Sequence, residues 1–350
     1  MRKIKVLVVE DSILFQRLLA DNLNKDPMIE VIAVASNPYE ARDEIVKQKP
    51  DVMTLDLEMP RMGGLEFLRK LMPQVPIPTV VISSLSDKVF DAIRAGAVDF
   101  VAKPSGMDRA AVESFIKNEL AIKVKIASTC KVDKFKKVKP EYHHEGMINS
   151  AGKNKVIAIG ASTGGTEAIF DVVSKFDKDI PGVVVVQHMP PGFTQMYANR
   201  LNNQCKVVVK EAEDGDKVVA GQVLIAPGDK QMRLKKVAGG YQVECYFGEK
   251  VSGHCPSVDV LFESVAEHAG KDAIGIILTG MGRDGAAGLL RMRQAGAETI
   301  GQNQASCVVY GMPREAFNCG AVMYQENLDN IADRVYRLLE KDVLTEGGNI

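Results

Sequence analysis

One serine stands in a turn that could make it a nucleophile. Residues 156–165 read Val-Ile-Ala-Ile-Gly-Ala-Ser-Thr-Gly-Gly, so an apolar run leads straight into Gly160-x-Ser162-x-Gly164. The glycines remove side chains that would clash in a sharp strand-to-helix turn, which lifts the hydroxyl out of the strand end. The pattern predicts acyl transfer. Phosphate binding is the alternative at such a turn, but the glycines do not follow GxGxxG and no Gly-Lys-Thr follows, so a nucleotide site is disfavoured.

A serine hydroxyl needs a base to take its proton and an acid to orient that base. His188 follows the apolar run 183–187 and precedes a proline-stiffened loop, and Asp284 lies in a glycine-rich turn after the run 276–278. We therefore expect Ser162, His188 and Asp284 to share one edge of a parallel sheet. Each also has a simpler interpretation: Asp284 as a helix N-cap, and His188 as an ordinary loop histidine.

Two further features border this predicted site. Backbone N–H groups around Met281 are candidates to hold a developing oxyanion. The neighbours His254 and Cys255 offer a competing nucleophile. Adjacent side chains on an extended segment point in opposite directions, so a direct dyad is disfavoured. We expect His254 to border the pocket.

A second constellation lies near the N-terminus, where acidic residues follow apolar runs. Glu10 and Asp11 end the first run, and Asp56 ends the third. Three carboxylates at one mouth are unfavourable without a cation, and oxygen ligands in an open site suit Mg²⁺. Lys103 supplies a compensating charge, and Ser83 offers a hydroxyl to a phosphoryl oxygen. The alternative is that acidic residues merely favour loops that end strands.

The elements that must position these groups alternate between apolar runs and amphipathic stretches, which indicates an α/β chain of two domains. Residues 1–123 contain five strand–helix repeats, which predict a flavodoxin-like parallel sheet covered on both faces. Residues 154–343 are predicted to form a doubly wound, mostly parallel α/β domain with an antiparallel hairpin at Gly239-Gly240. The lysine-rich segment 124–153 is expected to be a flexible linker, with a basic binding patch as the alternative, and 344–350 a disordered tail.

The expected strands are 4–9, 31–35, 52–56, 79–83, 99–103, 156–159, 183–187, 207–209, 223–226, 233–237, 241–247 and 273–278. The expected helices are 13–24, 38–48, 64–72, 87–95, 109–123, 166–175, 194–203, 258–268, 286–295 and 328–341.

Composition disfavours several classes of function. The chain has 350 residues, 46% of them hydrophobic, which is enough for two full cores. A net charge of −1 argues against a general nucleic-acid binder. No apolar run approaches the roughly 20 residues that span a bilayer, and the N-terminus leads into a strand rather than a signal peptide. Six scattered cysteines indicate reduced thiols, so we expect a cytoplasmic protein without direct membrane insertion.

Residues 3–123 resemble response-regulator receiver domains. The resemblance implies Asp56 as the phosphorylated residue, Glu10 and Asp11 beside Mg²⁺, Lys103 and Ser83 as sensors of the phosphoryl group, and Phe100 as a switch aromatic. Glutamate at position 10 departs from the aspartate of many receivers. The matching segments are Val8-Val9-Glu10-Asp11-Ser12, Leu55-Asp56-Leu57-Glu58-Met59-Pro60-x-Met62-Gly63-Gly64 and Phe100-Val101-Ala102-Lys103-Pro104.

Residues 154–343 resemble the catalytic domain of chemotaxis protein-glutamate methylesterases. The resemblance implies a catalytic triad of Ser162, His188 and Asp284, with Thr163 and Met281 framing the oxyanion site and no cofactor in this domain. The matching segments are Ile159-Gly160-Ala161-Ser162-Thr163-Gly164-Gly165, Gln187-His188-Met189-Pro190, Leu224-Ile225-Ala226-Pro227-Gly228 and Leu278-Thr279-Gly280-Met281-Gly282-x-Asp284-Gly285.

Together the two resemblances imply a phosphorylation-activated serine esterase that acts on glutamate methyl esters of chemoreceptors and also deamidates receptor glutamines. A chemotaxis histidine kinase would be the phosphodonor. We expect the unphosphorylated receiver to cover the serine, and nothing in the sequence requires more than a monomer. The rival interpretations are a signalling adaptor whose second domain only binds a partner, and a receiver fused to a nucleotide-dependent enzyme.

Overall fold

The computed structural model describes residues 2–84, 86–104, 108–130, 132 and 155–346, with the backbone alone for 341–346. The chain divides into two compact units, Met1–Val138 and Lys139–Ile350, which are described separately. Residues 131 and 133–153 of the predicted linker and residues 347–350 of the predicted tail lie outside the described residues. Within the described part, no helix is both long and apolar enough to cross a membrane.

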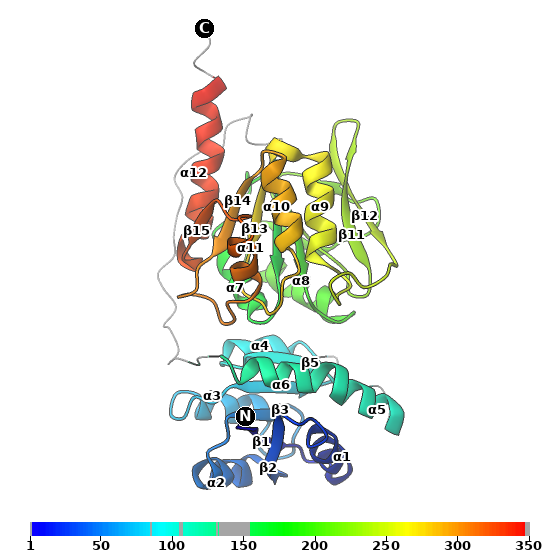
Figure 1. Cartoon of the computed structure of the whole chain (residues 1–350), viewed down its shortest axis with the longest axis vertical. Helices are drawn as coiled ribbons and strands as arrows, with labels where there is room; N and C mark the ends of the chain where they lie inside the picture. The colour runs from blue at the N-terminus through cyan, green and yellow to red at the C-terminus, as the bar shows by residue number, and fades with distance from the viewer. Residues whose placement is uncertain (1, 85, 105–107, 131, 133–154, 347–350) are drawn as a thin grey trace. The chain divides into compact units, whose positions relative to one another are not determined.

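The first unit is built on a five-stranded parallel sheet in the order β2-β1-β3-β4-β5 (Figure 1). The central strands β3 and β4 are buried along their whole length, as expected for a sheet covered on both faces. The sequence predicted all of these elements to within two residues. They are β1 (Ile4–Val9), β2 (Ile29–Ala35), β3 (Val52–Asp56), β4 (Thr79–Ser83), β5 (Asp99–Ala102), α1 (Ile13–Leu23), α2 (Pro38–Gln48), α3 (Gly64–Leu71) and α4 (Lys88–Arg94).

The last helical segment of this unit runs further than predicted. Helix α5 (Arg109–Phe115) passes through a π-helical turn (Ile116–Leu120) into α6 (Ala121–Ala127). The wider π turn accommodates an extra residue and shifts the helical face, so Val124 and Ala127 are still fully buried. The expectation that a flexible linker begins at residue 124 is therefore wrong, because the first residues of that segment are helical.

The second unit is built on a seven-stranded parallel sheet in the order β15-β14-β13-β6-β7-β10-β8, with a separate antiparallel sheet β11-β12-β9. The doubly wound fold and the hairpin are confirmed, and Val237 pairs with Gly240 across its turn. The strands are β6 (Val156–Ala161), β7 (Gly182–Gln187), β8 (Val208–Glu211), β9 (Lys217–Val218), β10 (Gln222–Ile225), β11 (Gln231–Val237), β12 (Gly240–Tyr246), β13 (Ala273–Ile277), β14 (Glu298–Gln302) and β15 (Tyr324–Glu326).

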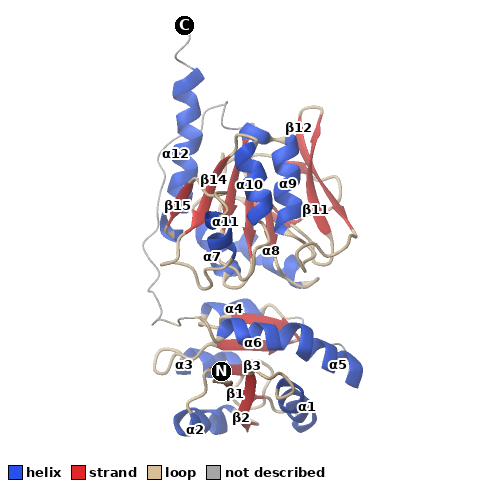
Figure 2. Ribbon diagram, in the orientation of Figure 1, coloured by secondary structure: helices blue, strands red, loops and turns tan. Residues whose placement is uncertain are grey.

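Helices cover both faces of the seven-stranded sheet, as the colouring by secondary structure makes clear (Figure 2). Helices α9, α10 and α11 pack together against β13, β14 and β6, with α9 also against the hairpin strand β11, whereas α7 packs with α12 and α8 with β8 and β10. They are α7 (Gly165–Val173), α8 (Phe193–Gln204), α9 (Val258–His268), α10 (Ala286–Gln294), α11 (Met312–Asn318) and α12 (Leu328–Glu346).

Among the described elements of this unit, the sequence prediction missed the strands β9, β14 and β15, the helix α11 and a 3₁₀ turn at Gly270–Asp272. It also ended the last helix too early. Helix α12 continues to Glu346, directly before Gly347-Gly348, so residues 344–346 are not a disordered tail.

Candidate active site

Three neighbouring strands bring the predicted triad to one sheet edge. Ser162 directly follows β6 and His188 directly follows β7, and these strands pair in parallel with Ala161 opposite Gln187. The amide of His188 donates to the carbonyl of Ala161 over 3.2 Å. Asp284 comes from the loop after β13, on the other side of β6. The strand order reverses between β13 and β6, which is where open α/β sheets form their ligand sites.

The turn that carries the serine is held by main-chain hydrogen bonds. The amide of Gly165 donates to the carbonyl of Ser162 over 2.7 Å, and the amide of Ser162 donates to the carbonyl of Thr279 over 3.0 Å. Gly164, at the N-cap of α7, has a φ of 77°, which favours glycine. The neighbouring loop approaches closely, since a Cβ on Gly280 would lie 2.7 Å from the Cβ of Ser162.

This close approach places the two predicted oxyanion residues beside the serine. Met281 follows Gly280 and has an exposed side chain, at 46%. Thr163 follows Ser162 and is buried, and its carbonyl accepts a hydrogen bond from the Thr279 hydroxyl over 3.0 Å. The side chain of Thr279 therefore locks the serine turn to the loop that carries Met281.

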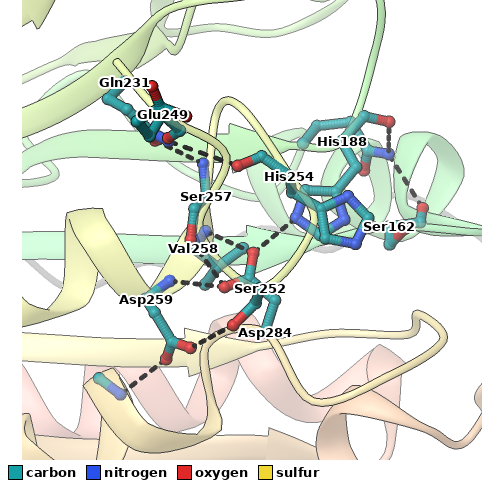
Figure 3. Close-up of polar contacts among 12 residues, drawn as sticks. Ser162, His188, Gln231, Glu249, Ser252, His254, Ser257, Val258, Asp259 and Asp284 are labelled. Carbon is teal, nitrogen blue, oxygen red and sulfur yellow. Dashed lines mark hydrogen bonds and ion pairs between the residues drawn. The ribbon is translucent and has the colours of Figure 1, made fainter.

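Asp284 accepts four hydrogen bonds, three of them from the start of α9 (Figure 3). Its Oδ2 lies 2.7 Å from Nε2 of His188 and 2.8 Å from the amide of Val258. Its Oδ1 accepts from the hydroxyl of Ser257 over 2.7 Å and from the amide of Asp259 over 3.0 Å. The interpretation of Asp284 as a cap of the helix that follows it is wrong, since Gly285 caps α10. Asp284 instead meets the N-terminus of a helix earlier in the chain.

These donors fix the charge of the acid. Burial would raise the pKa of Asp284, but the hydrogen bonds from His188, Ser257 and Val258 and the attraction of the imidazole lower it to about 2. An ionised carboxylate has no proton to donate, so Nε2 of His188 must carry the shared proton. The other ring nitrogen, Nδ1, is buried and makes no hydrogen bond among the described residues. It is the nitrogen left to act as a base.

The sequence analysis missed Gln187, which joins the serine turn to the histidine loop. Its side-chain amide donates to the carbonyl of Ser162 over 2.9 Å and to the carbonyl of His188 over 3.2 Å. The residue is 4% exposed, at the last position of β7. A polar residue that ends an otherwise apolar strand, directly before the predicted base, was the available signal.

His254 lies against His188. The rings of His254 and His188 are stacked, with centroids 3.6 Å apart and planes 8° apart (Figure 3). Burial, with the charge of Asp229, raises the pKa of the neighbouring Cys255 thiol. A raised pKa keeps the thiol protonated and argues against Cys255 as the nucleophile.

Val258 packs between two glycines of this site. A Cβ on Gly160 would lie 2.2 Å from a methyl carbon of Val258, and one on Gly285 would lie 2.5 Å from the same methyl. The valine side chain thus fills the space beside both glycines, while its amide donates to Asp284. The start of α9 is therefore fixed against both β6 and the loop of the acid.

The first unit gathers its predicted acidic site at the ends of β1 and β3. The carboxylates of Glu10, Asp11 and Asp56 offer oxygens that lie within 4.8 Å of one another. The ammonium of Lys103 lies 2.8 Å from Asp56 and 3.0 Å from Glu10. Burial, then the charge of Asp56, raises the pKa of Glu10 to about 7 although Lys103 opposes this. Three carboxylates with one lysine leave an excess of negative charge, and the all-oxygen donor set fits Mg²⁺.

The other predicted residues of the first unit lie on β4 and β5. Ser83 directly follows Ile82, which pairs with Asp56, and its hydroxyl is buried without a hydrogen-bond partner among the described residues. A buried hydroxyl beside the acidic cluster fits a group that receives a ligand. Phe100 is buried, with its ring edge-on to Phe90 at 6.1 Å between centroids.

Comparison with known proteins agrees with this division. The CheB methylesterase family model matches residues 157–335, and the response regulator receiver domain model matches residues 6–113. The chain is 58% identical over 346 residues to the protein-glutamate methylesterase/protein-glutamine glutaminase 2 of Syntrophomonas wolfei, a match that spans 97% of this chain and 99% of that protein.

Two further relatives extend this finding. The protein-glutamate methylesterase/protein-glutamine glutaminase of Salmonella typhimurium is 48% identical over 340 residues, covering 96% of this chain and 97% of that protein. The crystal structure of the Thermotoga maritima CheB methylesterase catalytic domain is similar to 53% of this chain and 98% of its own chain, with 36% identity and a TM-score of 0.52.

Proposed function

This chain belongs to the CheB methylesterase family and carries a receiver domain before its catalytic unit, and from that premise we propose how its residues act. The substrate is the γ-methyl ester of glutamyl side chains on chemoreceptors, and receptor glutamines are deamidated at the same site. The observation that carries the proposal is the hydrogen bond between Asp284 and Nε2 of His188, which leaves the buried Nδ1 without a partner among the described residues, at the end of the strand that pairs with the strand before Ser162.

The proposed reaction has two halves. The hydroxyl oxygen of Ser162 attacks the ester carbonyl while Nδ1 of His188 takes its proton. The tetrahedral intermediate collapses, the bond to the methoxy oxygen breaks, and methanol leaves with the proton from His188. Water then attacks the acyl-enzyme, its proton passes to His188, and the proton returns to Ser162 as the glutamate carboxylate leaves. With a glutamine substrate the leaving group is ammonia.

Asp284 and the oxyanion residues play supporting parts in this scheme. The ionised carboxylate at Nε2 stabilises the imidazolium that forms each time His188 accepts a proton. Thr163 and Met281 frame the place where negative charge develops on the substrate oxygen. Their position is supported by the close approach of Gly280 to Ser162.

In the receiver domain we assign phosphorylation to Asp56. Glu10, Asp11 and Asp56 would hold Mg²⁺, which neutralises charge on the phosphoryl group when it is bound. Lys103 would pair with the phosphoryl oxygens and the unpartnered hydroxyl of Ser83 would donate to one of them. Phe100 would report this change as a switch aromatic. Phosphorylation activates the enzyme, and a chemotaxis histidine kinase in the cytoplasm supplies the phosphoryl group to the monomer.

The test is release of methanol from methylated chemoreceptors by the full chain, with and without Mg²⁺ and a small-molecule phosphodonor. We expect Ser162→Ala to abolish release in both conditions and Asp56→Asn to abolish only the stimulation by the phosphodonor. Wild-type rates in Ser162→Ala would refute the serine mechanism. Stimulation that persists in Asp56→Asn would refute the assignment of the phosphorylated residue.

A further inference from the structure

The imidazole of His254 lies flat on the imidazole of the proposed base. The ring centroids are 3.6 Å apart and the planes differ by 8°, so the two rings are in van der Waals contact over their faces (Figure 3). His254 lies on none of the three strands of the triad edge. It comes from the loop between β12 and α9, where it forms an isolated bridge with Val251.

We propose that His254 is a positioning residue, which holds the ring of His188 in the plane that directs Nδ1 at the hydroxyl of Ser162. The inference rests on the proposed function, because it concerns how the base of that reaction is oriented. It adds a fourth side chain to the triad, one that acts through His188 rather than on the substrate.

The need for such a residue follows from the bonds that His188 makes. Nε2 is held by Asp284 over 2.7 Å, but Nδ1 has no hydrogen bond among the described residues. A single bond at one edge of an imidazole leaves the ring able to tilt about that bond, and the χ2 torsion of histidine has only broad minima. A flat group against one face of the ring removes this freedom, and small errors in the placement of a base have large effects on rate.

His254 is itself held in place by the groups that organise the acid. Its backbone exchanges hydrogen bonds with Val251 over 2.9 and 3.0 Å, and its carbonyl also accepts from the side-chain amide of Gln231 over 3.3 Å. The carbonyl oxygen of that same amide accepts from the backbone of Ser257 over 2.8 Å, and Ser257 donates to Asp284. Gln231 therefore holds the backbone of both His254 and Ser257. The stacked ring and the hydroxyl that donates to Asp284 are thus fixed relative to each other.

The stacked geometry also suits the charge that His188 acquires. When Nδ1 takes the serine proton, the imidazolium lies against the face of a second aromatic ring, and the faces of aromatic rings attract cations. An aliphatic side chain of similar size fills the space but offers neither a flat surface nor this attraction. Substitutions at position 254 can therefore separate the effect of a flat ring from the effect of side-chain volume.

The experiment compares His254→Phe, His254→Leu and His254→Ala in the full chain, with methanol release from methylated chemoreceptors measured under phosphodonor and Mg²⁺. We expect His254→Leu and His254→Ala to lower kcat about 10- to 100-fold with KM within about threefold, because a misdirected base slows chemistry without weakening binding. The flat, apolar ring of His254→Phe should keep kcat within about threefold of wild type.

A spectroscopic measurement accompanies the kinetics. In the full chain labelled with ¹⁵N-histidine, the signal of His188, identified by its loss in His188→Gln, should report one tautomer with the proton on Nε2. His254→Phe should retain that signal, and His254→Leu should broaden it or mix in the other tautomer. Circular dichroism of each variant verifies that the fold is intact.

The outcomes distinguish this inference from the proposed function. If wild type is active and Ser162→Ala is inactive, but the leucine and phenylalanine variants have equal kcat, the positioning role is wrong while the esterase mechanism stands. A rise in KM at constant kcat would also overturn it, because His254 would then contact substrate instead. If wild type releases no methanol, the proposed function itself fails.

Discussion

The two sites of this chain lie at equivalent places in their sheets, but the charges of their carboxylates are compensated in opposite ways. Both lie where parallel strands end, one beyond β1 and β3 and the other beyond β6, β7 and β13. In the catalytic unit, Asp284 receives four hydrogen bonds and its pKa falls to about 2. In the receiver, Glu10, Asp11 and Asp56 lie close together, Lys103 pairs only with Glu10 and Asp56 among them, and the pKa of Glu10 rises to about 7.

This difference in charge compensation indicates what each site does. A carboxylate whose donors are all in place keeps its charge and position through a reaction, which is electrostatic preorganisation. A cluster with more carboxylates than cations has excess negative charge, and it is stabilised most when a metal ion binds. We infer that the catalytic site is rigid, whereas the receiver site is arranged to receive a metal ion.

Asp284→Asn tests the charge of the catalytic acid and should have the largest effect of the substitutions considered. The amide keeps the shape of the carboxylate but loses its charge and favours the wrong tautomer of His188. We expect methanol release to fall by about a thousandfold or more, as for the acid of a serine triad. The assay is single-turnover and steady-state methanol release by the full chain, with Asp259→Asn as a matched change of the neighbouring acid. A loss of less than about tenfold would mean that the charge of Asp284 matters little.

Gln187→Met tests whether the catalytic edge is rigid because of its polar ties. Methionine preserves length and volume but donates nothing to the carbonyls of Ser162 and His188. We expect kcat to fall about 10- to 100-fold through misplacement of the two groups, and stability to fall by about 1–3 kcal/mol because two part-buried carbonyls each lose a donor. Urea unfolding and methanol release measure the two effects. Unchanged kcat with reduced stability would limit Gln187 to a structural role.

Ser257→Ala removes one of the four donors to Asp284 and so probes how its charge is held. We expect a loss of roughly tenfold in kcat, the worth of one hydrogen bond to a charged group. The folded-state pKa of Asp284 is depressed, so its contribution to stability is present above pH 3.8 and is lost as pH falls through about 2. In Ser257→Ala the folded-state pKa should lie closer to 3.8, so this loss should be smaller and should be complete at a higher pH. Unfolding free energies between pH 2 and pH 4, compared with wild type, give the measurement.

Glu10→Gln changes the receiver and should have the smallest effect. Because the folded-state pKa of Glu10 is raised from 4.5 to about 7, ionising it costs stability, and this cost grows as pH rises through that window. Above that window, without Mg²⁺, Glu10→Gln should therefore be more stable than wild type, by an amount on the order of 1–2 kcal/mol. Calorimetry of the full chain checks this, with the exposed Glu30→Gln as control. Mg²⁺ should stabilise wild type more than Glu10→Gln, and equal stabilisation would contradict the comparison.

The sequence predicted the elements whose pattern is local and apolar. Runs such as 156–159 and 183–187 became buried strands, and the serine and histidine at their ends were found from that pattern. The missed strand β14 shows the opposite case. Its Thr299 and Gln302 are buried but polar, and they are accepted there because Thr299 donates to the carbonyl of Ala321 and Gln302 accepts from the amide of Thr279. Their partners lie over 20 residues away along the chain, so no local pattern could reveal them.

The candidate site divides in the same way. The hydrogen bond between His188 and Asp284 was predicted because both residues follow strands and their chemistry is distinctive. Ser257 was not predicted, since its hydroxyl meets Asp284 only after α9 packs beside β6. The π turn in the receiver was also missed, because its effect appears only in which later residues, such as Val124, face the core.

Val258 has a consequence for how this protein can change over generations. Its methyl group occupies the volume that a side chain at position 160 would need, so that position can accept alanine only after the valine has become smaller, whereas Gly285 has a φ of 87° that favours glycine in any case. Yet the amide that Val258 gives to Asp284 belongs to the backbone and would survive such a change. A lineage could therefore remodel this corner of the site in a fixed order, with Val258 first and Gly160 second, while the acid never loses that donor.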